Sequence, residues 1–160
     1  MTDERWLPRK LSFRAHGRNL VLAKRPGEKL EHRLMMALLW ALYLPDYPEL
    51  RIDVPVGSRY RPDLVQLDQD GRPHFWAEAG AVSTEKLRFL ISRYRSTHLV
   101  FARWDPAPRE FGAQIEAALK DLRRSAPIEL IGFDNQAAEH IDADGTIGIN
   151  RADVSSWRWE

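Results

Sequence analysis

The dipeptide Asp70-Gly71, which stands between two apolar runs, is the feature that most constrains how this chain can fold. Asp-Gly in that setting is a strong signal of a two-residue β-hairpin turn. Counting inward from the turn, one residue at a time on each strand, places Asp63 directly opposite Glu78. Directly opposed residues point to the same face, with Cβ atoms about 4.5–5.5 Å apart. The sequence therefore predicts a hairpin on which two carboxylates face each other.

This carboxylate pair requires a neutralising partner. Two carboxylates at such a separation repel each other unless one is protonated or a cation lies between them. Glu78, between Trp76 and Gly80 in a central strand, would be costly to bury alone, whereas Asp63 by itself could simply begin a strand. We therefore expect an acidic metal site, on condition that no bulge shifts the register. His74 is expected on the same face, too near the turn to be a ligand.

The absence of cysteine narrows the kind of metal. The 160 residues include no cysteine and carry a net charge of +1. Oxygen and imidazole ligands favour hard ions such as Mg²⁺, Mn²⁺ or Ca²⁺. Because the net charge is near zero, any nucleic-acid surface has to be local, and an ordinary solvated charged face is the alternative. The candidate phosphate-binding residues are Arg59, Arg61, Lys86, Arg88, Arg93 and Arg95.

The hydrophobic pattern predicts an α/β fold in one domain spanning residues 1–160. The segment from Leu34 to Leu44 is apolar almost all round, which indicates a helix buried against a sheet. Helix, three strands, helix and strand in succession predict a mixed central sheet flanked by helices. The expected helices are 27–44, 83–95 and 109–124; the expected strands are 51–56, 63–68, 74–80, 97–104 and 128–133, with a hairpin in 11–22 and a strand at 146–150.

A third acid is expected from the first helix. Glu31 precedes Met35, Leu38 and Leu42 at spacings of four, seven and eleven residues, which places it on the buried stripe of that helix. Such an acid would project toward the sheet and could serve as a metal ligand or base. Glu28, one turn earlier, is a second candidate. The alternative for Glu31 is an acid favoured at a helix start by the helix dipole.

Three segments resemble a known family. Pro62-Asp63 followed across a hairpin by Glu78 resembles the signature of the PD-(D/E)XK nucleases. The resemblance is more specific to the YaeQ-like branch, covers roughly residues 20–104 and, more loosely, 128–133, and is carried by LVLAKRPGEKLEHRLMMALLWAL (20–42), RPDLV (61–65) and WAEAGAVSTEKLRF (76–89). It implies a restriction-endonuclease-like core. It also implies a metal-dependent nuclease in which Asp63, Glu78 and Glu31 hold Mg²⁺ or Mn²⁺.

One position departs from the nuclease pattern. The superfamily has a lysine two residues after the second acid, where this chain has Gly80. A cation there would stabilise charge on the scissile phosphate, and Lys86 in the next helix could take that role. The first hypothesis is therefore a divalent-metal-dependent nuclease acting on DNA or RNA. The alternatives are a nuclease-fold module that binds nucleic acid or a protein without cutting, and a small-molecule enzyme on the same scaffold.

The expected cellular setting is the cytoplasm. The chain begins with Met-Thr-Asp-Glu and shows no basic segment followed by an apolar one, so no secretion signal is expected. The longest apolar segment is too short to span a bilayer. We therefore expect no membrane partner.

Overall fold

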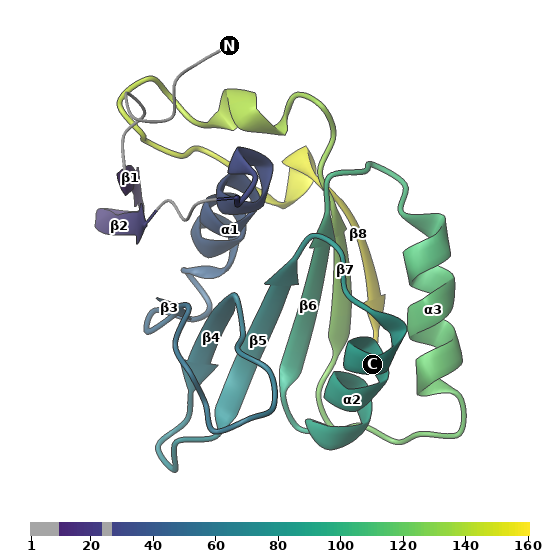
Figure 1. The fold of residues 1–160 in the computed structure, drawn as a ribbon. Helices are drawn as coiled ribbons and strands as arrows, with labels where there is room; N and C mark the ends of the chain where they lie inside the picture. The colour runs from purple at the N-terminus through teal and green to yellow at the C-terminus, as the bar shows by residue number, and fades with distance from the viewer. Residues whose placement is uncertain (1–9, 24–26) are drawn as a thin grey trace.

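Six strands form one mixed sheet with helices on both faces (Figure 1). The computed structural model describes residues 10–23 and 27–160. The sheet runs in the order β3 (Arg51–Ile52), β4 (Leu64–Leu67), β5 (Pro73–Ala79), β6 (His98–Arg103), β7 (Ile128–Gly132), β8 (Ser155–Trp159). Strands β5, β6 and β7 are mutually parallel, and the other neighbouring pairs are antiparallel.

Within the described residues, three α-helices and a separate hairpin flank the sheet. The hairpin precedes α1 in the chain, and two short 3₁₀ helices lie in the last third of the chain. Figure 1 shows α1 and the hairpin on one side of the sheet, with α2 and α3 on the other. The bounds are β1 (Lys10–Ala15), β2 (Arg18–Ala23), α1 (Leu30–Tyr43), α2 (Thr84–Arg93), α3 (Arg109–Leu119), η2 (Ala137–His140) and η3 (Arg151–Asp153).

Alternate residues of the central strands belong to two different cores. On β5, Phe75 and Ala77 pack in the core that contains α1, whereas Trp76 packs with Leu87 and Leu90 of α2. Parallel strands covered on both faces are expected to be apolar at successive positions, as β5 and β6 are. No helix in the described ranges is both long enough and apolar enough to cross a bilayer.

The predicted order of helix, three strands, helix and strand is confirmed, but several bounds are not. Strand β3, predicted to span 51–56, ends at Ile52, because Asp53 has φ of 55° and its N–H bonds to the carbonyl of Asp63. Helix α3 ends at Leu119 and does not reach residue 124. Segment 146–150 forms only isolated bridges, and the last strand is β8 at the sheet's edge.

The β4–β5 hairpin differs from the expected two-residue turn. Asp68 N–H bonds to the carbonyl of Arg72, so the loop has three residues and ends on Gly71, with φ of 79°. The register then shifts by one residue between Gln66 and Leu67, and His74 is the extra residue on β5. The bulge cancels the longer loop, so the inner register, with Leu64 opposite Ala77, is the predicted one.

Gly132, at the end of β7, allows close approach of the loop after β6. A Cβ atom at this position would lie 2.5 Å from the backbone oxygen of Asp105, so the loop would have to move. We expect Gly132→Ala to lower the free energy of unfolding by about 1–3 kcal/mol, measured by urea denaturation. Gly148→Ala is the matched control, because no atom lies within 4 Å of its added methyl group. Equal stabilities for the two variants would contradict this packing argument.

Candidate active site

The predicted acids Asp63 and Glu78 come together at the end of the β4–β5 hairpin. The register places them opposite each other one step beyond the last paired residues, Leu64 and Ala77. Side-chain hydrogen bonding between the two carboxyl groups contributes to the low pKa of Asp63. A proton or another cation beside the pair would relieve the repulsion between the two carboxylates.

Glu78 points toward α2 and is almost completely buried. Its Oε1 atom accepts hydrogen bonds from Trp76 Nε1 at 3.0 Å and from Lys86 Nζ at 2.8 Å. Burial and the neighbouring charge of Asp63 raise the pKa of Glu78 well above its ordinary value, although Lys86 opposes this shift. Glu78 is thus the member of the pair that holds the proton.

Asp63 is linked to the first helix. Its Oδ2 atom accepts the backbone N–H of Ala79 at 2.8 Å and lies 3.2 Å from His32 Nε2 of α1. Burial would raise the pKa of Asp63, but the hydrogen bonds from His32 and Ala79 outweigh it and hold the pKa below its usual range. The hydrogen bond to Asp63 in turn raises the pKa of His32 to about 9, against the effect of burial. Asp63 and His32 therefore form an ion pair at neutral pH.

The ion pairs continue from His32 to Glu28, just before α1, and from Glu28 to Arg33 on the helix. His32 Nδ1 lies 2.6 Å from Glu28 Oε1, and the other oxygen of Glu28 pairs with Arg33 at 2.8 Å. Arg33, which is buried, also pairs with Asp53 at 3.0 Å. Together with Asp63, Glu78 and Lys86, these side chains form one network of acids and bases among the described residues.

Glu31 does not lie on the buried stripe of α1. Its side chain is exposed, and the structure gives it no hydrogen bond or ion pair within the described residues. It lines an open hollow of about 540 Å³ that also contains His32, Gly80 and Arg103. The residue of α1 that reaches Asp63 is instead His32, and His32 connects Asp63 to Glu28, which precedes the helix. Sequence reasoning missed His32, although its spacing of four residues from Glu28 is an available signal.

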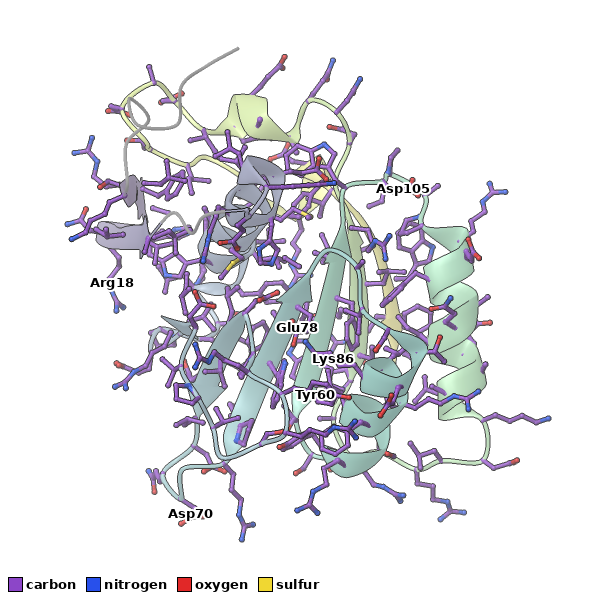
Figure 2. All side chains as sticks on the ribbon, viewed as in Figure 1. Arg18, Tyr60, Asp70, Glu78, Lys86 and Asp105 are labelled. Carbon is purple, nitrogen blue, oxygen red and sulfur yellow. The ribbon has the colours of Figure 1, made fainter. Side chains whose placement is uncertain are left out.

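Lys86 occupies the place that the sequence analysis assigned to a substitute lysine. Ser83 caps α2 by accepting the backbone N–H of Lys86 at 3.1 Å, and this places the lysine in the first turn beside β5. Gly80 has φ of 88°, a conformation that a lysine would adopt only with strain. Figure 2 shows Glu78, Lys86 and Tyr60 close together on the α2 side of the sheet. Lys86 Nζ lies 5.3 Å from the centroid of the Tyr60 ring.

The two carboxylates suit an ion such as Mg²⁺, which keeps water or substrate oxygens among its ligands, better than an ion bound by protein ligands alone. No group of three His, Asp or Glu side chains in residues 10–23 and 27–160 is arranged to hold a metal. Mg²⁺ is commonly bound by one or two carboxylates, with water and substrate oxygens completing its shell. Asp63 Oδ2 and Glu78 Oε1 are each engaged by two donors, so Asp63 Oδ1 and Glu78 Oε2 are the atoms that would bind an ion. The donor set therefore fits Mg²⁺ or Mn²⁺.

Comparison with solved structures finds two YaeQ proteins with a similar fold. The crystal structure of the YaeQ protein from Pseudomonas syringae superposes with a TM-score of 0.59 and 16% identity, covering 86% of this chain and 80% of that one. YaeQ from Xanthomonas axonopodis pv. citri gives 0.58 and 23%, covering 81% and 73%. This chain has the YaeQ fold. No protein-family profile and no curated protein sequence matches it. The structural similarity therefore establishes the fold, and any activity has to be inferred from the site.

Proposed function

We propose that this YaeQ-fold protein is a divalent-metal-dependent nuclease of the PD-(D/E)XK type, with a restriction-endonuclease-like core, acting on nucleic acid in the cytoplasm. The observation that carries the proposal is the 2.8 Å contact between Lys86 Nζ and Glu78 Oε1. This contact brings a lysine ammonium to the pair of opposed acids. The nuclease signature has its lysine at the position of Gly80, whereas here the lysine comes from α2. Acid, acid and lysine are the three groups that such chemistry needs.

Each side chain has a distinct role in this proposal. Asp63 and Glu78 would hold Mg²⁺ or Mn²⁺, which when bound supplies Lewis-acid polarisation of a phosphate and a lowered pKa for a bound water. Lys86 would donate to the oxygens of the scissile phosphate, where negative charge increases. His32 orients Asp63 through its hydrogen bond to Oδ2. Glu31, on the rim of the neighbouring hollow, is proposed as an accessory carboxylate.

Lys86→Ala tests the role of the relocated lysine. We expect hydrolysis of a DNA or RNA substrate with Mg²⁺ to fall by about 100-fold, because one donor to the developing charge is removed. Lys120→Ala is the control, since Lys120 is an exposed lysine at the end of α3. The measurement is initial cleavage rate with saturating metal. Equal rates for wild type and Lys86→Ala would contradict the assigned role, and no cleavage by wild type of any nucleic acid would contradict the proposed function.

A second candidate is a module of the same fold that binds nucleic acid or a protein without cutting. One observation favours it: both acids already have basic partners, His32 on Asp63 and Lys86 on Glu78. The two acids can therefore be neutralised by these basic partners without a metal ion. Titration calorimetry with Mg²⁺ and Mn²⁺ separates the two functions, because a module without a metal role should bind neither ion.

A further inference from the structure

Three aromatic side chains form a row on the α2 side of the sheet, beside the acid pair. Tyr60, from the loop between β3 and β4, lies 5.2 Å from Phe89 of α2 between ring centroids, and Phe89 lies 6.2 Å from Tyr94. All three rings are partly exposed. We call Tyr60, Phe89 and Tyr94 the ring strip. Neighbouring rings meet edge to face, at 66° and 73°, so bases would stack on them one ring at a time and not on a continuous flat surface.

Basic side chains accompany the ring strip along its length. At the Tyr60 end, Lys86 Nζ and Arg59 Cζ lie over the Tyr60 ring, 5.3 and 5.2 Å from its centroid, so a base that stacks on Tyr60 has to displace one of these side chains. At the other end, Arg72 and Arg93 line a hollow of about 470 Å³ together with Tyr94. Positive charge therefore borders the rings at both ends, as required for a polyanion that also stacks.

The acids near the ring strip are already engaged. Glu85 pairs with Arg59 at 2.6 Å. Asp68, which also lines the hollow, accepts the backbone N–H groups of Asp70 and Arg72 through Oδ1 at 2.9 Å each. These contacts reduce the repulsion that each carboxylate would exert on an incoming phosphate.

The strip is connected to the acid pair. Tyr94, its last ring, lies 5.0 Å from the Trp76 ring, and Trp76 donates its indole N–H to Glu78. Lys86 contacts both Tyr60 and Glu78. Each end of the strip is therefore one side chain away from Glu78, through the buried Trp76 at the Tyr94 end and through Lys86 at the Tyr60 end.

We propose that the ring strip binds single-stranded nucleic acid, with bases stacked on its rings and phosphates facing Arg59, Arg72 and Arg93. Bases of a duplex are stacked on one another and cannot use such rings, so the row favours an unpaired strand. An acidic peptide would use the charges and leave the rings unused. The use of the strip to deliver a strand to Asp63 and Glu78 rests on the proposed nuclease function, whereas the binding itself does not.

The test is fluorescence anisotropy of labelled single strands in EDTA, so that no metal-dependent cleavage interferes. The probes are an oligothymidylate and an oligouridylate of about twelve nucleotides, a length chosen from known single-strand site sizes. We expect Tyr60→Leu to weaken binding by about tenfold or more, because base–aromatic stacking is lost. Phe89→Leu, a second variant that keeps the apolar volume, should weaken binding in the same way. Trp157→Leu is the control, being an exposed aromatic residue on β8 away from the strip.

Salt dependence tests the charged part of the proposal. We expect Arg93→Gln to lower the slope of log affinity against log salt by about 0.7, the value for one phosphate contact on a single strand. Arg18→Gln is the control, since Arg18 lies on the separate β1–β2 hairpin (Figure 2). The proposal is supported if wild type binds the DNA strand, the RNA strand or both, and if Tyr60→Leu and Phe89→Leu weaken that binding.

Three outcomes would overturn the proposal: no binding by wild type at low salt, equal affinity for a duplex with no effect of Tyr60→Leu, or equally strong competition by polyglutamate. The last would identify an acidic protein partner. Binding is measured in EDTA and cleavage is measured separately with Mg²⁺, so the two proposals fail independently. Absence of cleavage would contradict only the nuclease function, and absence of binding would contradict only the role of the ring strip.

Discussion

Asp63→Asn is expected to abolish binding of Mg²⁺ and Mn²⁺ in titration calorimetry and to lower hydrolysis on the order of 1,000-fold. The substitution keeps the shape of the side chain and removes the charge of one of the two proposed ligands. Glu78 alone, with its Oε1 atom engaged by Trp76 and Lys86, would offer a single oxygen to an ion. Asp70→Asn is the matched control, because Asp70 is exposed in the loop of the same hairpin (Figure 2).

The same variant has a readout that does not depend on activity. Asp63 supplies the hydrogen bond and charge that raise the pKa of His32 to about 9, so in metal-free buffer that pKa should fall toward the ordinary value. The pKa of Glu78 should fall as well, because the repulsion from Asp63 is gone. NMR titration of the His32 ring protons measures the first shift. A His32 pKa that stays near 9 in Asp63→Asn would show that Asp63 is not its partner.

A linked effect is expected for wild-type stability. The folded-state pKa values of His32 and Glu78 are both raised, so the folded protein binds more protons than the unfolded chain. Their contribution to stability is full below the unfolded pKa values and is lost as pH rises through the folded ones. In metal-free buffer, the contribution of these two groups to the free energy of unfolding, measured by urea denaturation, should therefore decrease as pH rises from about 4.5 to about 9.

The opposed acids were predictable from the sequence although one premise of the prediction was wrong. The two-residue turn is a three-residue loop, stabilised by hydrogen bonds from Asp70 and Arg72 to the Asp68 side chain. A bulge at His74 restores the register, because a one-residue shift would turn the buried positions of both strands to the wrong face. Burial thus selected the register that simple counting from the turn had also given.

The contribution of α1 could not be read from the sequence in the same way. Beyond Leu34 the helix is buried almost all round, so the apolar pattern does not define which side faces the acids. A difference of one residue, Glu31 or His32, is a rotation of about 100° around the helix. The pairing of His32 with Asp63 depends on how the helix packs against the sheet, which only the structure gives. Strand β8 escaped prediction because its residues are mostly polar and exposed at the sheet's edge.

Glu129→Gln is expected to have the largest effect on folding. Glu129 lies on β7, is almost completely buried, and is 2.7 Å from His98 Nε2 and 2.7 Å from Arg151 Nη1. Burial would raise its pKa, but the hydrogen bonds from His98 and Arg151 outweigh it and lower the pKa to about 2. The cluster joins β6, β7 and the segment before β8, with Tyr47 bonded to the other ring nitrogen of His98 at 2.7 Å. Glutamine keeps one acceptor oxygen and has an NH₂ donor in place of the other, so the charge is lost and one of the two partners loses its acceptor.

We expect this substitution to lower the free energy of unfolding by about 3 kcal/mol at pH 7, the value of a pKa shift of this size. Because the folded pKa is depressed, the stabilisation is present above the ordinary glutamate pKa of 4.5 and is lost as pH falls toward about 2. Urea denaturation of wild type and variant from pH 7 downward should therefore show a difference that shrinks below pH 4.5. Glu139→Gln, at an exposed carboxylate in η2, should match wild type throughout. A difference that persists unchanged into acid would mean that packing, and not the charge of Glu129, stabilises this cluster.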